Sequence, residues 1–341
     1  MYGRHGVRVT IAAAFAVIAS SSALSAASPE ESYFQGKTVR FTVGYSPGGG
    51  YDIYARMLAP YYKKYLGANV VVENRPGAGG IIARNATYQA TPDGLTMMIV
   101  KGSAAIMAQI TDEPAVRYDM SKFGYLGGTG ASAEEWLVTP NSPIKTFADV
   151  KKSDKTMIWA ATGPMDGLSD GALMTCKALK IKCKVLMGFP GTSDAALALA
   201  RGEADAMIVN DSTSSVYVAN GNARAIATMF GKRSRFFQDL PTIYEAASLS
   251  DEEKWWLDLR IGVNIMGRVI VVPPNMPPER LKYMQDVSKK VMTDPAVVAE
   301  GEKTKRYIEY QSAEEMRVLA NKLVGGISIE EKKRVRELMV N

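Results

Sequence analysis

Strand-like and helix-like runs alternate through most of this chain, and that alternation limits the folds open to it. "NVVVENR" is typical of a strand, "PGAGG" of a turn and "IIARNATYQA" of a helix, and "TMIWAATGPMDGLSDGALMTCKAL" repeats the order. Repeated strand–helix order predicts an α/β fold with largely parallel sheets. The 341 residues are enough for about two domains.

The first 27 residues have the pattern of an export signal. Arg4 and Arg8 precede an apolar stretch from Val9 to Leu24, and small residues follow in "SSALSAAS". This pattern predicts a signal peptide over 1–27, removed on export, and a periplasmic protein. Removing Arg4 and Arg8 lowers the formal net charge from +6 to +4, and no dense basic run remains, so nucleic-acid binding is not expected.

The only histidine, His5, lies in this leader. Its absence from the rest of the chain removes Ser–His–Asp and Cys–His catalytic pairs and the commonest metal ligand, so no metal or cofactor is expected. The two cysteines, Cys176 and Cys183, leave a disulfide open: an exported protein permits one, but a helix end and the next strand need not meet its geometry.

Two loops share one order of residues. Each runs from an aromatic residue through Pro, Gly and small polar residues to an Asp that we expect to cap a helix; they are Tyr45–Asp52 and Phe189–Asp194. The start of a helix exposes unpaired N–H groups, which attract anions, and glycine lets a ligand approach the backbone closely. If each loop belongs to a different domain, the two could hold one anion from both sides. The alternative is that Asp52 and Asp194 are ordinary caps on loops that bind nothing.

The first loop does not match a phosphate-binding motif. Pro47–Tyr54 has no Lys at the helix start, and neither this loop nor Pro76–Ile81 supplies the dinucleotide pattern G-x-G-x-x-G. Asp52 also disfavours a doubly charged phosphate. A carboxylate, held by backbone N–H groups, hydroxyls and water, fits better.

Several polar residues follow predicted strands, where a cleft would lie, although each one alone is more often an ordinary turn residue. They are Ser103, Thr162, Gly163, Asn210 and Asp211. We interpret Trp136, Trp159 and Trp255–Trp256 as core packing, and the pairs Glu134–Glu135 and Glu252–Glu253 as solvated surface.

Five segments together resemble the solute-binding proteins of tripartite tricarboxylate transporters, the Bug or TctC-like family. They are "VGYSPGGGYDIYARMLA", "VVVENRPGAGGIIARN", "TPDGLTMMIV", "GFPGTSDAALALARGEADAMI" and "FQDLPTIYEA", and the resemblance runs in order from Lys37 to about Ala320. It implies a two-lobed periplasmic binding protein fold of type II, whose lobes are joined by crossover strands. On this basis we expect lobe one at 36–134 plus 262–341, with the terminal helix packed on it, and lobe two at 135–261.

The resemblance also implies that the two loops grip a carboxylate. The positions that match are Ser46, Gly48, Gly49, Gly50, Tyr51 and Asp52 in lobe one, and Pro190, Gly191, Thr192, Ser193 and Asp194 in lobe two. This sequence departs from the family pattern at Tyr51, at Thr192–Asp194 and in "SLSDEEKWWLDLRIGVNIMGRVIVVPP", which leaves the rest of the ligand open.

The function expected is therefore capture of a small organic mono-, di- or tricarboxylate by a monomer that delivers it to the membrane subunits of an uptake transporter. Two alternatives stay open: a periplasmic enzyme of similar fold that works without histidine, and a partner that presents its ligand to a sensor receptor.

Overall fold

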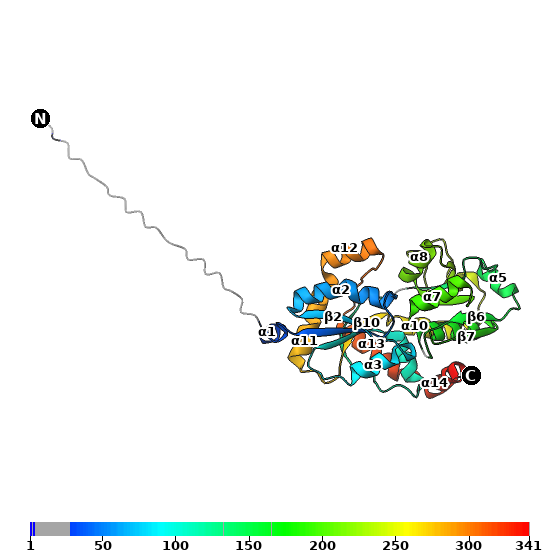
Figure 1. Ribbon diagram of the computed structural model, residues 1–341, viewed down its shortest axis with the longest axis horizontal. Coiled ribbons are helices and arrows are strands. Elements are labelled where there is room, and N and C mark those ends of the chain that lie inside the picture. The colour runs from blue at the N-terminus through cyan, green and yellow to red at the C-terminus, as the bar shows by residue number, and fades with distance from the viewer. Residues whose placement is uncertain (2, 4–27, 132, 165, 341) are drawn as a thin grey trace.

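Two five-stranded sheets organise the chain, each in its own lobe (Figure 1). The computed structural model describes residues 1, 3, 28–131, 133–164 and 166–340, so nearly all of the predicted leader lies outside the described residues. The first sheet has the order β2-β1-β3-β10-β4 and contains β1 (Thr38–Val43), β2 (Asn69–Asn74), β3 (Thr96–Lys101), β4 (Gly124–Gly128) and β10 (Arg268–Val272). The second has the order β7-β6-β8-β5-β9 and contains β5 (Glu134–Val138), β6 (Met157–Ala160), β7 (Cys183–Leu186), β8 (Ala206–Asn210) and β9 (Arg224–Thr228).

The two sheets follow the same plan. In the first, β1 pairs in parallel with β2 and β3, and β10 runs antiparallel between β3 and β4. In the second, β6 pairs in parallel with β7 and β8, and β5 runs antiparallel between β8 and β9. Because β5 and β10 each follow a passage of the chain from one sheet to the other, they are the crossover strands expected of a hinged, two-lobed fold.

Helices cover both sheets (Figure 1). Around the first lie α1 (Pro29–Phe34), α2 (Gly50–Leu66), η1 (Ala78–Gly80), α3 (Ile81–Tyr88), α4 (Gly102–Ile110), α11 (Pro278–Thr293), α12 (Pro295–Thr304) and α13 (Ala313–Gly325). Around the second lie α5 (Phe147–Lys152), α6 (Gly167–Leu179), α7 (Thr192–Arg201), α8 (Asp211–Ala219), α9 (Ile243–Ala246), α10 (Asp251–Asn264) and α14 (Ile329–Val340).

Helix α2 illustrates why the spacing of apolar residues in the sequence predicts a helix. Leu58, Tyr62 and Leu66 recur at helical spacing and are all buried, so one face of the helix packs on the first sheet. The helix ends at Gly67, whose left-handed φ of 69° suits glycine and closes the last turn through its N–H to the Lys63 carbonyl.

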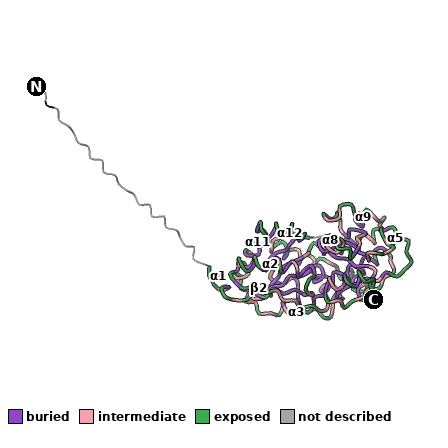
Figure 2. The backbone as a smooth tube through the Cα atoms, turned by 45° about the horizontal axis from the view of Figure 1, so that its top comes forward, coloured by how far each residue is buried: buried purple, intermediate pink, exposed green. Residues whose placement is uncertain are grey.

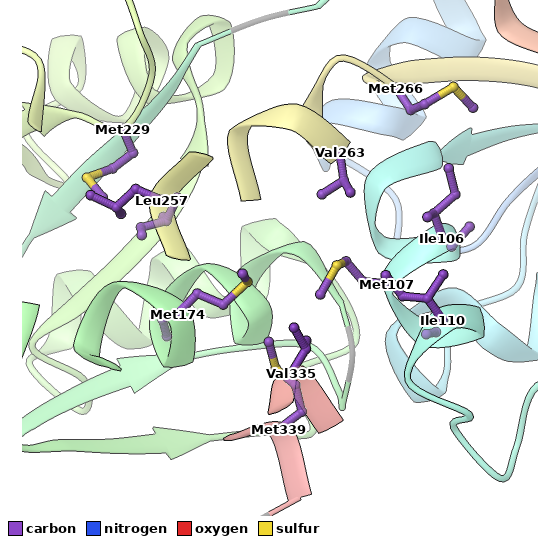
Figure 3. Close-up of a cluster of buried hydrophobic side chains, with 14 of the residues drawn as sticks. Ile106, Met107, Ile110, Met174, Met229, Leu257, Val263, Met266, Val335 and Met339 are labelled. Atoms are coloured by element: carbon purple, nitrogen blue, oxygen red, sulfur yellow. The ribbon is translucent and has the colours of Figure 1, made fainter. Parts of the chain in front are cut away.

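One apolar cluster joins the two lobes. Ile106 and Met107 of α4 lie beside Met174 of α6 and Val335 and Met339 of α14 (Figure 3). Buried backbone accordingly runs through both lobes, and exposed backbone lies at the periphery (Figure 2). Trp136, Trp159 and Trp256 are also fully buried, which confirms that they are core residues.

The terminal helix does not lie where we expected it. Helix α14 packs on α6, beside the second sheet, and Arg334 forms an ion pair with Glu252 of α10 at 2.6 Å. The apolar spacing predicted the helix but not its partner, because an amphipathic helix packs on whichever apolar face the fold leaves open. The residue boundaries of the two lobes stay a prediction.

A disulfide links Cys176 at the end of α6 to Cys183 at the start of β7. The helix end and the strand do therefore meet, with the two Cα atoms 6.2 Å apart. Among the described residues, no helix has both the length and the apolar character needed to cross a bilayer.

Candidate functional site: the contact between the two lobes

The two glycine-bearing loops touch each other across the lobes. Ser46 Oγ donates a hydrogen bond of 2.6 Å to Asp194 Oδ2, and the Ser46 N–H donates to the Pro190 carbonyl at 3.3 Å. These residues come from opposite sheets and lie 148 positions apart. The structure therefore brings together the two loops that share a sequence pattern.

The helix starts differ by three residues from those we predicted. Gly49 and Gly191 are the N-cap residues of α2 and α7, and Asp52 and Asp194 stand in the first turn of each helix. The prediction of Asp caps was wrong because these carboxylates have other partners. Asp194 accepts from Ser46 of the other lobe, whereas Asp52 accepts from residues of its own lobe.

Asp52 fixes the shape of the first loop. Its carboxylate accepts the Gly48 N–H at 2.9 Å, and Arg56 and Asn74 also donate to it. Burial raises the pKa of Asp52, but the hydrogen bonds from Arg56, Gly48 and Asn74 outweigh it and hold that pKa below its usual value. The Gly48 N–H is thus already bonded within the protein.

Glycine is required where the loops meet. A Cβ atom on Gly191 would lie 3.1 Å from the Ser46 backbone nitrogen, closer than carbon normally approaches. A Cβ atom on Gly50 would lie 2.7 Å from Thr213 Oγ1 of α8. Gly49 faces Thr192 in the same contact, and Ser193 follows in the first turn of α7. At this contact the two lobes therefore approach each other through backbone atoms that carry no side chain.

A small cavity of about 20 Å³ lies between the lobes beside these loops. It contains three of the predicted site residues, Tyr51, Ser103 and Asn210. Ser103 Oγ is buried and has no hydrogen-bond partner among the described residues. The remaining lining residues are Lys101, Glu134, Asn264, Gly267 and Arg268.

Thr162 and Gly163 make a second contact between the lobes. A Cβ atom on Gly163 would lie 2.9 Å from the backbone carbon of Ala78, so this glycine presses on the η1 turn of the first lobe. Thr162 Oγ1 donates a hydrogen bond to Asp166, which caps α6 through the N–H groups of Leu168 and Ser169. Neither Thr162 nor Gly163 lines the small cavity.

A larger cavity of about 590 Å³ lies on the side of the crossover strands. Asp211 lines it, and its carboxylate accepts from the Ser212 N–H at 2.7 Å and from Ser234 Oγ at 3.0 Å. Burial raises the pKa of Asp211. The walls come from both lobes and comprise Tyr54, Thr129, Gly130, Ala131, Ala133, Ser212, Phe230, Lys232, Arg233, Ser234, Arg235, Phe236, Gln238, Arg268, Tyr307 and Glu309.

Arg268, at the start of β10, lines both cavities. Only 3 % of it is exposed, and its guanidinium carbon lies 4.1 Å from the centre of the Tyr54 ring. Its Nε and Nη2 atoms are buried without a hydrogen-bond partner among the described residues.

Buried charges cluster on the other side of the small cavity. Lys101 Nζ lies 2.7 Å from Glu134 Oε1, Arg260 forms an ion pair with Glu134, and Arg260 Nε lies 3.5 Å from Asp170 Oδ1. Asn264 also donates to Glu134 at 2.8 Å. Burial alone would raise the pKa of Glu134, but Arg260 and Lys101 lower it to about 2. Burial raises the pKa of Asp170 to about 6.

The interpretation of Glu134 and Glu135 as solvated surface was wrong. Both are buried, and they extend to opposite faces of β5. Glu135 accepts from Thr228 Oγ1 at 2.8 Å, and burial raises its pKa to about 9. Side chains on opposite faces of one strand meet different surroundings, so two adjacent glutamates have pKa values far apart.

Sequence reasoning missed Lys101, Arg260 and Arg268. A usable signal exists for two of them: Lys101 ends and Arg268 begins a strand whose other residues are apolar, in "TMMIVK" and "RVIVV". A charged side chain at the end of an otherwise apolar, buried strand must be paired with an opposite charge or lie in the wall of a cavity. Among the described residues, no group of three or more His, Cys, Asp or Glu side chains could hold a metal ion.

Two lobes, two crossover strands and facing loops at the helix starts define a periplasmic solute-binding protein fold. Two solved structures share it. MatC from Rhodopseudomonas palustris, solved with bound malate, has a TM-score of 0.74 at 19% identity and covers 88% of this chain and 99% of its own. The periplasmic binding protein BugD has a TM-score of 0.72 at 20% identity, with 89% and 98% covered.

The family follows from the sequence. The family described as "Tripartite tricarboxylate transporter family receptor", TctC, matches residues 54–325, and the chain belongs to it. A relative from Cupriavidus necator, "UPF0065 protein in gbd 5'region", is 28% identical over 308 residues and covers 86% of each chain. The family and these binding proteins of similar fold are solute-binding proteins, and no family of enzymes is indicated.

Proposed function

We propose that this protein is a periplasmic receptor that closes its two lobes on a small organic carboxylate and delivers it to the membrane subunits of a tripartite transporter. The observation that carries the proposal is the contact between the two loops, where Ser46 of one lobe donates to Asp194 of the other. A ligand held between these loops would stabilise the closed arrangement, which is how a hinged receptor signals that it is loaded.

The helix starts supply the groups for one carboxylate. Helices α2 and α7 begin on either side of the loop contact, and the first N–H groups of a helix have no partner within it. Together with the helix dipoles, these donors favour a negative charge. The N–H of Gly48, the residue before the N-cap of α2, is not available to a ligand, because Asp52 already accepts it.

Buried hydroxyls add further donors. Ser103 Oγ and Thr213 Oγ1 are buried without hydrogen-bond partners among the described residues, and Thr213 lies next to Gly50. Unpaired buried hydroxyls are costly unless a ligand or a water bonds to them. The malate in MatC, a protein of similar fold, supports a carboxylic acid as the ligand.

The test is a thermal-shift screen of mono-, di- and tricarboxylates, because a ligand that binds only the folded protein raises its melting temperature. We expect at least one carboxylate to stabilise the protein and to be recovered unchanged. A screen without any shift would contradict the proposal, and turnover of the acid would point to an enzyme.

Asp194→Ala tests the loops themselves. This variant removes the acceptor of Ser46 Oγ, and we expect weaker binding of the stabilising acid with the fold retained. Glu203→Ala is the matched control, because it removes the same charge just beyond the exposed end of α7. Equal affinity of Asp194→Ala and Glu203→Ala would remove the loops from the site.

A further inference from the structure

Arg268 is a buried cation that forms no ion pair with the described residues. Its two unpartnered nitrogens, Nε and Nη2, are enclosed by protein, and no carboxylate of the described residues lies within ion-pair distance of it. A buried charge costs several kcal/mol unless it is paired and hydrogen-bonded. Stacking on the Tyr54 ring offsets only part of that cost.

Other buried arginines do not share this combination. Arg260 pairs with Glu134 and Asp170, and Arg306 donates to the Ser212 carbonyl at 2.7 Å. Arg84 and Arg306, like Arg268, have buried nitrogens without partners among the described residues, but neither lines the small cavity or the larger one. Arg268 alone among these four is both unpaired and on a cavity wall.

The larger cavity beside Arg268 suits an organic anion. Tyr54, Phe236 and Tyr307 supply aromatic walls, and Arg235 stacks on Tyr307 at 4.5 Å. Exposed Lys232 adds a further positive charge at the edge of the cavity. Of the two acidic lining residues, Glu309 is exposed, and Asp211 is near enough for Arg268 to offset part of the rise in its pKa but forms no ion pair with it. The same walls contain four cationic residues, so the cavity keeps a net positive charge.

We propose that Arg268 pairs with a second acidic group of the ligand, whose body lies in the larger cavity between the aromatic walls. This inference rests on the proposed function, in which a first carboxylate lies at the helix starts. The two positions are close, because Arg268 lies 5.5 Å from the ring of Tyr51, the second residue of α2. Arg268 lines both cavities, so its guanidinium presents its charge to a carboxylate bound there, and hydrogen bonds between ionised partners are the strong ones. The ligand class is therefore a dianion, and Arg268 selects it against the corresponding monoacid.

The experiment compares a diacid with its own half ester. Glutarate, adipate and pimelate are titrated calorimetrically beside their monomethyl esters, against the wild-type protein, Arg268→Met and Lys322→Met. A hydrogen-bonded charge contributes about 1.5–3 kcal/mol, so we expect the wild type to bind the best diacid about tenfold or more tightly than its ester. Arg268→Met should bind the two within about twofold. Lys322→Met, which loses the same charge at an exposed position of α13 away from both cavities, should keep the preference.

A second measurement separates ligand pairing from a structural role. Since Met replaces a buried unpaired charge, the melting temperature of Arg268→Met without added acid should be equal to or above that of the wild type. A lower melting temperature, a preference that survives in Arg268→Met, or an equal loss in Lys322→Met would overturn the inference. A wild type that binds diacid and half ester equally would also overturn the inference, but carboxylates would still bind and the proposed function would stand. If no mono-, di- or tricarboxylate binds at all, both the inference and the proposed function are contradicted.

Discussion

Arg260 and Arg268 are eight positions apart and equally buried, yet their surroundings are opposite. Arg260 lies among Lys101, Glu134 and Asp170, so its charge is balanced inside the protein. Arg268 has an aromatic ring and two cavities, and no carboxylate of the described residues forms an ion pair with it. Burial alone therefore does not assign a role to a charged residue. The paired charge of Arg260 stabilises the contact between the lobes, whereas the unpaired charge of Arg268, on a cavity wall, is available to a ligand.

The largest expected effect comes from breaking the ion pairs of Arg260. Arg260→Met leaves Glu134 and Asp170 buried without their main partner, and breaking such a pair costs about 3–5 kcal/mol. We expect the free energy of unfolding, measured with urea, to fall by that amount. Arg268→Met is the matched control and should show no such fall. Equal losses of unfolding free energy in the two variants would contradict the claim that Arg260 is paired and Arg268 is not.

The two adjacent glutamates give the next effect, which depends on pH. Glu135 has a folded-state pKa raised to about 9, so its contribution is complete below its ordinary pKa of 4.5 and is lost as pH rises through 9. The wild-type free energy of unfolding should therefore fall across this window, by up to about 1.4 kcal/mol per pH unit. Glu135→Gln keeps an acceptor for Thr228 and should flatten the fall. A profile as steep as the wild type's would show that Glu135 does not titrate as proposed.

Glu134 should behave in the opposite way. Its pKa is lowered to about 2, so its contribution is present above 4.5 and is lost as pH falls toward 2. Acid unfolding followed by circular dichroism should shift less with pH below 4.5 in Glu134→Gln than in the wild type, although the variant starts from a lower stability. An unchanged acid profile would contradict the pairing of Glu134 with Arg260 and Lys101.

The smallest effect is expected where the loops meet. Ser46→Ala removes one hydrogen bond across the lobes, which contributes about 1 kcal/mol, far less than the buried cluster. Adding Ser46→Ala to Asp194→Ala should then cost almost nothing more, because both changes remove the same bond. Fully additive losses in chemical denaturation would mean that the two side chains act separately.

The sequence predicted most of the fold but neither of the two arginine environments compared above. Alternating strand and helix patterns led to both sheets, and the shared loop grammar led to Ser46 and Asp194, because these signals are local. The partners of Lys101, Arg260 and Arg268 are not local: they come from β5, α6 and α2, and pairing depends on how the lobes pack. The wrong interpretation of Glu134 and Glu135 has the same origin. Two adjacent charged residues suggest an exposed segment unless it is known that helices or loops cover both faces of the sheet.

A crystal structure with the tightest-binding acid of the screen tests the central claim most directly. We predict one carboxylate within hydrogen-bond distance of the first-turn N–H groups of α2 and α7, and a second acidic group on Arg268. An acid bound away from both helix starts, with the Ser46 and Asp194 loops open to solvent, would contradict the account.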